Sequence, residues 1–308
     1  MAKVIVFGSL NMDISVECDD FPKRGETITG GGLLMTPGGK GTCQAVECAR
    51  MGADTFMVGK VGDDQYGRQI VAALTKHGVS PMNVSITRRA ATGVALITRA
   101  KGDKTIVTDP GANYKMTYAE VRAAIHGLGQ RGNIFLAQLG CDPDATFESI
   151  KCAKRNELYT VLNASPVQSL PLDLYPSLDL LCVNATECRS ICGIAPMNDG
   201  SIKEAIDWFG ERGVGSTVIT LGSQGSATVI DGKLVKVPAY HVSVVDTTAA
   251  GDAYVGELVA HLAFDGTLEE SMKYASAAAA ICITRVGAQE TMPRWDEVEE
   301  FVKMREQA

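Results

Sequence analysis

The sequence predicts an α/β fold in which a parallel sheet carries helices on both faces. Short, nearly continuous apolar runs alternate with helical stretches along the chain, which is the pattern of strands buried on both faces. Several helical stretches end at a glycine, the residue that most readily takes the left-handed conformation after a helix. Since the 308 residues show no repeat and no low-complexity linker, we expect one three-layer domain over residues 1–308.

Seven apolar runs are predicted as strands, at 3–9, 54–62, 93–99, 133–140, 159–165, 178–184 and 217–222. Five amphipathic stretches between them are predicted as helices, at 42–51, 67–77, 118–128, 145–155 and 202–212. The glycines expected to end helices are Gly52, Gly78, Gly129 and Gly213.

Two segments do not follow this alternation, namely residues of about 12–37 and 92–109. The second resembles a β-hairpin with its turn at 101–103. We expect the two segments to pair into a small separate sheet that serves as a lid. The alternative is that they are edge strands of the main sheet.

Composition excludes some functional classes. The formal net charge is −7 and the sequence has no block of basic residues, so binding to nucleic acid is not expected. No apolar stretch reaches the roughly 18 residues of a membrane span. Nine irregularly spaced cysteines, without a recognisable leader segment, indicate reduced thiols in a cytoplasmic protein. Cys182, Cys188 and Cys192 have no histidine at ligand spacing, so a zinc site is not expected.

The strongest chemical motif is DTTAAGD, at 246–252. A helix is predicted to start near Ala250, with almost no side chain at Ala249, Ala250 and Gly251. Their amides can converge on an oxyanion at the positive end of the helix dipole. Asp252 follows in the first helical turn, where acidic residues are also common for purely structural reasons. An anion hole beside a carboxylate base is what phosphoryl transfer to a hydroxyl needs.

Two weaker motifs lie in the first 45 residues. Asn11 and Asp13 follow the first strand and suit a polyhydroxy ligand, although an Asx turn would use the same residues. The segment 36–45 places Gly39 and Lys40 at a tight bend before a helix. It is not a Walker loop, and no GxGxxG follows the first strand. The alternative for Lys40 is a solvated surface lysine.

A third weak motif is NATE, at 184–187. Glu187 lies at a strand end, where a carboxylate could hold magnesium or its water. Asn184 and Glu187 also have the spacing of a helix capping box, and the motif alone favours that interpretation.

Taken together, these motifs resemble those of the ribokinase-like carbohydrate kinases. The similarity covers essentially the whole chain, because GSLNMD, GGKGTCQA, TGVALI, GAN, NATE, TLGSQG, DTTAAGD and TRVGAQETMP occur in the family's order and spacing. The resemblance implies a nine-stranded sheet with a β lid that often forms a homodimer. It also implies phosphorylation of a hydroxymethyl group of a sugar by ATP with Mg²⁺.

The resemblance assigns roles to residues that match the motifs. Asp252 is expected to be the base, and Ala249, Ala250 and Gly251 the anion hole. The residues expected to bind the sugar are Asn11, Asp13, Gly39 and Lys40. Asn184 is expected at the ATP phosphates and Glu187 at the magnesium water. The nucleotide site is expected to include Thr220, Gly222, Ser223, Gly225 and Ser276. A potassium site is expected from Asp246, Thr248, Cys282, Arg285, Gly287 and Thr291.

Two sugar-contact positions depart from the family pattern. Cys43 stands where the family has the asparagine of GGKGAN, and Gly140 where it has a glutamate. Loss of two polar contacts can change specificity by roughly tenfold or more. One hypothesis is a bulkier or less polar acceptor beside Gly140, such as a nucleoside or substituted sugar. The other is that ribose or a related pentose is still the acceptor, with water filling the gap.

Two other classes of function remain as alternatives. A non-catalytic sugar or nucleotide sensor would be expected to lack the base or the anion hole, and both are present. An NAD-dependent oxidoreductase would share the α/β sheet, but the sequence lacks the glycine fingerprint of that class.

Overall fold

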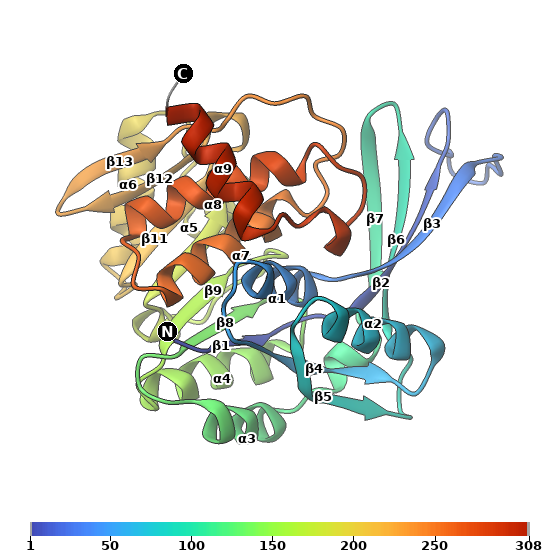
Figure 1. Ribbon diagram of the computed structural model, residues 1–308, viewed down its shortest axis with the longest axis horizontal. Helices are drawn as coiled ribbons and strands as arrows, with labels where there is room; N and C mark the ends of the chain where they lie inside the picture. The colour runs from blue at the N-terminus through green and yellow to red at the C-terminus, as the bar shows by residue number, and fades with distance from the viewer. Residues whose placement is uncertain (1, 307–308) are drawn as a thin grey trace.

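The computed structural model describes residues 2–306, and its core is a nine-stranded sheet (Figure 1). The strand order is β13-β12-β11-β10-β9-β8-β1-β4-β5. All neighbouring pairs from β11 to β5 are parallel, while β12 and β13 pair antiparallel at one edge. The strands are β1 (Val4–Phe7), β4 (Thr55–Gly62), β5 (Ser80–Thr87), β8 (Ile134–Gln138), β9 (Tyr159–Asn163), β10 (Leu180–Asn184), β11 (Ser216–Thr220), β12 (Ser226–Ile230) and β13 (Lys233–Val237).

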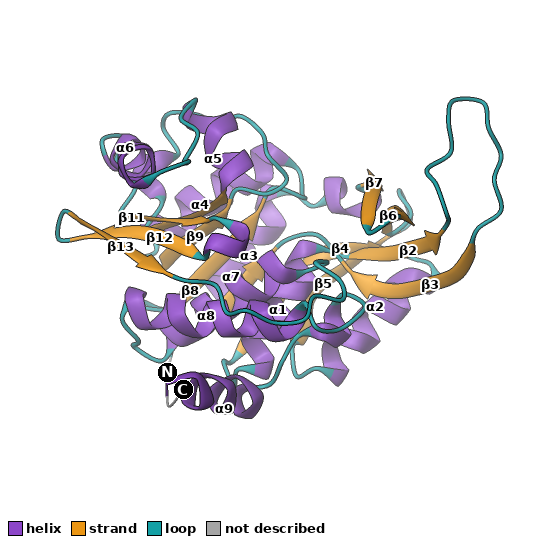
Figure 2. Ribbon diagram, turned by 90° about the horizontal axis from the view of Figure 1, so that it is seen from above, coloured by secondary structure: helices purple, strands orange, loops and turns teal. Residues whose placement is uncertain are grey.

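Helices cover both faces of this sheet, as Figure 2 shows. One face carries α1 (Lys40–Arg50), α2 (Gln65–Lys76), α7 (Ala250–Ala263), α8 (Leu268–Cys282) and α9 (Trp295–Glu306). The other carries α3 (Tyr118–Leu128), α4 (Pro143–Arg155), α5 (Ala185–Cys192) and α6 (Asp199–Gly210). Each layer buries its own apolar cluster against the sheet. The three-layer α/β fold predicted from the sequence is confirmed.

A separate four-stranded sheet projects from the main body (Figure 1). Its order is β3-β2-β6-β7, with β2 at Asn11–Glu17, β3 at Gly31–Gly38, β6 at Gly93–Ala100 and β7 at Asp103–Asp109. These strands come from the two segments that interrupt the strand–helix alternation. They pair with one another and not with the edges of the large sheet. The small sheet therefore lies beside the carboxyl ends of the parallel strands, where ligands bind in open α/β sheets.

Local signals predicted most elements but not all. Six predicted strands lie in the large sheet, while 93–99 belongs to the small one. The sequence analysis missed β5, β12 and β13, whose polar residues break the apolar runs. Gly52, Gly78 and Gly213 have the expected positive φ, but Gly129 is extended with φ −71°. None of the described helices is long and apolar enough to cross a membrane. The short 3₁₀ turns are η1 (Gly111–Lys115), η2 (Tyr175–Ser177), η3 (Gly222–Gln224) and η4 (Gln289–Thr291).

Candidate active site

Asp252 lies in the first turn of α7, at the carboxyl edge of the large sheet. Ala249 precedes the helix in the left-handed conformation, with φ 61°. This conformation is costly for a residue with a side chain, and such strain is concentrated at functional sites. It turns the chain so that α7 begins next to the small sheet. Asp252 itself is 8% exposed.

Two helices, α1 and α7, begin at this site without a side-chain cap. Gly39 and Ala249 are their N-cap residues, and neither has a side chain that caps the amides of the first turn. Helices α2, α3, α4, α5, α6 and α8 all have a capping side chain. The amide of Gly251 can therefore point toward an incoming anion, which the dipole of α7 also favours, while the Ala250 amide makes a long hydrogen bond, of 3.4 Å, to the Thr247 carbonyl oxygen.

A row of buried amide side chains holds the Asp252 carboxylate. Gln44 donates from Nε2 to Asp252 Oδ1 at 2.8 Å and to Asn163 Oδ1 at 3.0 Å. Gln138 Nε2 in turn donates to Gln44 Oε1 at 2.7 Å. Sequence reasoning did not identify these residues. A signal was present, because Lys40 and Gln44 are four apart on one helix face and both approach Asp252.

Asn11 and Asp13 lie within β2, not in a turn that ends β1. Asn11 Oδ1 accepts a hydrogen bond from Asn113 Nδ2 at 2.8 Å. Asn113 is fully buried and also accepts from the Leu10 amide at 2.9 Å. The side chain of Asn113 thereby orients Asn11 at the start of the small sheet.

Asp13, on the small sheet, lies near enough to Asp252 for the two charges to interact. Burial, followed by the nearby Asp252 carboxylate, raises the pKa of Asp13 to about 7, although Arg99, Lys40 and Lys104 lower it. Lys40 Nζ lies 3.9 Å from Asp252 Oδ1, so it faces the site instead of bulk solvent alone. An acid at this position can accept a hydrogen bond when ionised and donate one when protonated.

Gly39 allows the close approach of α1 to the loop after β1. Its φ is +94°, and a Cβ there would lie 2.7 Å from the Ser9 carbonyl oxygen. Cys43, on the first turns of α1, is 2% exposed. Burial and the negative charges of Asp252 and Asp13 raise the pKa of the Cys43 thiol, so it stays neutral.

Ser9 occupies the space next to Gly140. A Cβ on Gly140 would lie 2.8 Å from Ser9 Oγ and 2.9 Å from Ser9 Cβ. Ser9 is itself only 4% exposed. The glycine therefore accommodates a neighbouring side chain, and the open volume expected beside Gly140 is not there in the direction of its Cβ.

A cavity of about 500 Å³ lies between α7, α8 and the ends of β10 and β11. All of the residues predicted to bind the nucleotide line it, namely Asn184, Thr220, Gly222, Ser223, Gly225 and Ser276. Ala250 and Gly251 line it as well. Its apolar wall includes Val244, Ala279, Ala280 and Ile283, which sequence reasoning missed. This wall is suited to a flat aromatic ring, and the helix start to a phosphate.

Asn184 and Glu187 form the capping box of α5. Asn184 Oδ1 accepts from the Glu187 amide at 2.8 Å, and Glu187 Oε2 accepts from the Asn184 amide at 2.8 Å. The helix capping box, which was the alternative interpretation of this motif, is thus present in the structure. The box uses only one oxygen of Glu187, which leaves the other available to a hydrated metal ion.

The predicted potassium ligands come together beside the start of α7. The amide and hydroxyl of Thr248 donate to Asp246 Oδ1 at 2.9 and 2.6 Å. Cys282 Sγ lies 3.2 Å from Thr291 Oγ1 and 3.7 Å from the Thr248 carbonyl oxygen. Arg285 Nη1 donates to the Thr291 carbonyl oxygen at 3.5 Å, and Gly287 lies on the same loop with φ +127°.

The second carboxylate oxygen of Asp246, Oδ2, is buried and accepts no hydrogen bond from residues 2–306, as an oxygen that binds a cation would be, but it already has a cationic neighbour. Arg99 Nη2 lies 3.2 Å from Asp246 Oδ2. Lys104 Nζ donates to Thr248 Oγ1 at 2.9 Å. Burial alone would raise the pKa of Asp246, but the hydrogen bonds from Thr248 and the charges of Arg99 and Lys104 hold it below its ordinary value. The oxygen atoms of the predicted ligands suit a monovalent cation, whereas the positive charges of Arg99 and Lys104 beside them disfavour one.

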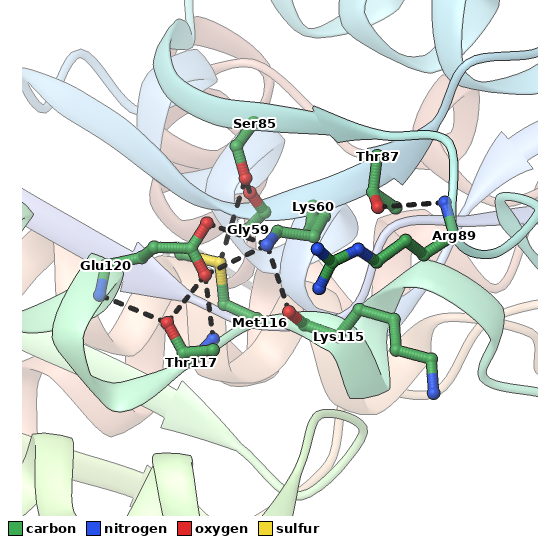
Figure 3. A network of polar contacts seen from close by, with 9 residues as sticks. All are labelled: Gly59, Lys60, Ser85, Thr87, Arg89, Lys115, Met116, Thr117 and Glu120. Carbon is green, nitrogen blue, oxygen red and sulfur yellow. Dashed lines mark hydrogen bonds and ion pairs between the residues drawn. The ribbon is translucent and has the colours of Figure 1, made fainter.

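A larger cavity, of about 760 Å³, is lined by none of these residues. Figure 3 shows the polar contacts of Lys60, one of its lining residues. Lys60 points into the cavity, but its ammonium already contacts both Glu120 carboxylate oxygens, at 2.7 and 2.9 Å, and the Lys115 carbonyl oxygen at 3.0 Å. Figure 3 shows the Lys115 side chain directed away from this cluster. The ammonium therefore has no donor left for a ligand.

Comparison with known proteins agrees with this geometry. The profile of the pfkB family carbohydrate kinases matches residues 1–295. The chain belongs to this family. The kinase is 32% identical to the ribokinase of Haemophilus influenzae over 299 residues, which cover 97% of both chains. It is 33% identical to the ribokinase of Bacillus subtilis over 302 residues, which cover 98% of this chain and all of the relative.

The fold of the kinase is also that of a solved ribokinase. The structure of Arabidopsis thaliana ribokinase complexed with ribose and ATP superposes with a TM-score of 0.88 at 31% identity, covering 98% of this chain and 99% of the other. The protein is therefore an ATP-dependent, ribokinase-like carbohydrate kinase.

Proposed function

We propose that the kinase transfers the γ-phosphoryl group of ATP to a hydroxymethyl group of ribose or a related furanose, with Asp252 as the base. One observation carries this proposal. Asp252 follows Ala250 and Gly251, which line the nucleotide cavity at the start of α7, and its carboxylate lies near Lys40 and Asp13.

In the proposed reaction Asp252 accepts the proton of the substrate hydroxyl as its oxygen attacks the γ-phosphorus. The bond from phosphorus to the bridging oxygen breaks, and ADP leaves with that oxygen. The amides of Ala249, Ala250 and Gly251 stabilise the charge that develops on the phosphoryl oxygens. Lys40, 3.9 Å from Asp252, adds a positive charge at the same place.

The residues that line the nucleotide cavity determine where ATP and magnesium would bind. We assign the nucleotide to the cavity lined by Thr220, Gly222, Ser223, Gly225 and Ser276, with its phosphates toward Asn184 and the start of α7. Magnesium bound to the phosphates would neutralise part of their charge. Glu187, with one carboxylate oxygen outside the capping box, would hold a water of its coordination shell.

Asn11, Asp13, Gly39 and Lys40 would bind the sugar. The position of Ser9 favours a compact acceptor, because it fills the space beside Gly140 that a nucleoside base would need. The similarity to relatives named ribokinase also favours a compact acceptor such as ribose. Cys43 supplies a neutral thiol where the family pattern has an amide, so a substituted sugar or nucleoside is the second candidate.

We further propose that the small sheet, formed by residues of about 12–37 and 92–109, is the lid of this site. The face of this sheet that is turned away from Asp13 exposes Leu33, Met35, Leu96 and Val107. An apolar patch of this kind on a sheet commonly marks a contact with another protein, and a second copy of this chain would form a homodimer through the lid. The cytoplasmic location stays a prediction.

The decisive experiment uses Asp252→Asn with ATP, Mg²⁺ and a panel of ribose, deoxyribose, fructose derivatives and nucleosides. We expect the variant to lose at least a hundredfold in kcat with little change in ATP binding, because the amide cannot accept the proton. Transfer at the wild-type rate would overturn the assignment of the base. A marked preference for nucleosides would instead overturn the choice of acceptor.

A further inference from the structure

Two cationic side chains of the small sheet reach the loop that precedes the anion hole. Arg99 lies near the end of β6, and its register partner Lys104 near the start of β7. The carbonyl oxygen of Arg99 accepts a hydrogen bond from the Cys18 amide at 2.9 Å, which anchors this end of β6. The two cations thus come from a fixed part of the sheet, and both are directed at residues 246–248.

Their contacts are with two of the predicted potassium ligands. Arg99 Nη2 lies 3.2 Å from Asp246 Oδ2, and the two side chains are only 25% and 12% exposed. Lys104 Nζ donates to Thr248 Oγ1 at 2.9 Å. The other oxygen of Asp246 is already used by Thr248. The guanidinium therefore occupies the side of the carboxylate that an added cation would need.

A potassium ion at this carboxylate would lie close to an existing positive charge. Two like charges at about 4 Å repel strongly when they are shielded from water. Binding of the ion would thus require Arg99 to move away, and the two cations would compete for one carboxylate oxygen. Arg99 is held near Asp246 as an ion pair, although Asp246 Oδ2 accepts no hydrogen bond from residues 2–306, and this tethered charge competes with an ion from solution for the carboxylate.

We infer that Arg99 is a tethered cation that takes the place of a monovalent ion at Asp246. It is a positioning residue: it neutralises Asp246 and steadies residues 246–248, which lead directly into Ala249 and the anion hole. Lys104 assists through Thr248. Because both side chains belong to the small sheet, the same contact couples the position of that sheet to the geometry of the anion hole.

This inference rests on the proposed function for its kinetic part, but its binding part can be tested without any turnover. The protein is studied in potassium chloride and in choline chloride at equal ionic strength. The thermal unfolding midpoint reports ion binding, and kcat with the best acceptor reports the anion hole. The variants are Arg99→Met, which removes the charge at similar length, and Arg99→Lys, which keeps it. Arg89→Met, at an exposed position by the larger cavity, is the matched control.

For the wild type and for Arg89→Met, we expect potassium to change kcat less than about twofold and to leave the unfolding midpoint in place. In choline chloride, the kcat of Arg99→Met should be about tenfold or more below that of the wild type. Potassium chloride should restore much of this kcat and should also raise the thermal unfolding midpoint of the variant. Arg99→Lys should behave more like the wild type.

Two results would overturn the inference. One is a wild-type protein that potassium stabilises as strongly as it stabilises Arg99→Met. The other is an Arg99→Met variant on which potassium has no effect, in either midpoint or rate. Failure of Asp252→Asn to lose activity would overturn the proposed base and leave the midpoint comparison unaffected.

Discussion

Gln44 donates a hydrogen bond from its side-chain amide to Asp252 Oδ1 at 2.8 Å, and both side chains are buried. The same amide group also contacts Asn163, while the Gln44 carbonyl oxygen accepts from Gln138. The orientation of each amide is therefore determined by its neighbour, and the row can present only N–H to the carboxylate. This leaves Oδ2 of Asp252 outside the row and free to accept a proton.

We predict that Gln44→Leu lowers kcat by about tenfold, because the carboxylate loses the donor that fixes its orientation, a hydrogen bond to a charged group worth about 1.5 kcal/mol or more. KM for ATP should change little, since Gln44 does not line the nucleotide cavity. Steady-state kinetics checks this. Gln130→Leu, at an exposed position, controls for the chemical change, and an unchanged kcat in Gln44→Leu would contradict the positioning role.

Ser9 and Gly140 form the second testable pair. A Cβ at 140 would lie within 3 Å of the Ser9 side chain, so Gly140→Ala should destabilise the protein by about 1–3 kcal/mol and raise KM for the acceptor. Replacing Ser9 with glycine removes the atoms that clash. We therefore expect Ser9→Gly combined with Gly140→Ala to be more stable than the sum of the two single variants predicts.

Urea unfolding and acceptor kinetics on the double-mutant cycle measure this coupling. Additive effects would mean that the two positions do not share one space. The departure from the family pattern at Gly140 would then have to be explained by the substrate alone.

Local sequence patterns predicted six strands of the main sheet, the segments of the small sheet and most helices, although not α8 and α9, because each of these predictions rests on neighbouring residues. The apolar runs of β1, β8, β9 and β10 are buried on both faces and show no alternation. Strands β12 and β13, at the edge, lack that signal. The start of α7 was also predicted from the sequence, because a run of residues with little or no side chain before a carboxylate has few structural reasons to occur.

Contacts between residues that are far apart in the chain could not be predicted from local sequence patterns. Gln44 and Asp252 are 208 residues apart, and Lys104 and Thr248 are 144 apart. Only the packing of α1 against α7, and of the small sheet against the loop before α7, brings them together. For the same reason the sequence showed that Gly140 lacks a side chain, but not that Ser9 fills the space.

Two buried carboxyl groups on facing helices give the last prediction. Glu47 on α1 and Glu257 on α7 are fully buried, and none of their four carboxylate oxygens has a hydrogen-bond partner among residues 2–306. A Cβ on Gly256 would lie 2.5 Å from Glu47 Cβ, which shows how closely the helices approach. Burial raises the pKa of Glu257 to about 8, and burial followed by the charge of Glu257 raises that of Glu47.

The raised pKa makes stability depend on pH in a defined direction. The unfolded chain releases the Glu257 proton near the ordinary glutamate pKa of 4.5, whereas the folded protein keeps it until about pH 8. Between these values the folded state binds more protons, so wild-type stability should fall as pH rises. Glu257→Met removes the carboxyl group that holds this proton, and with it this contribution to the pH dependence of stability. We therefore expect its stabilising effect to grow from pH 5 to pH 8.5 and to reach on the order of 2 kcal/mol.

Urea unfolding of the wild type and Glu257→Met at pH 5 and pH 8.5 measures the difference. Glu204→Met, at an exposed position on α6, is the control and should change stability by less than about 0.5 kcal/mol at either pH. A stabilisation by Glu257→Met that is equal at the two pH values would mean that the Glu257 carboxyl does not retain its proton in the folded protein. Because α7 also carries Asp252, the variant's kcat would then show whether the packing of α1 against α7 sets the position of Asp252, the proposed base.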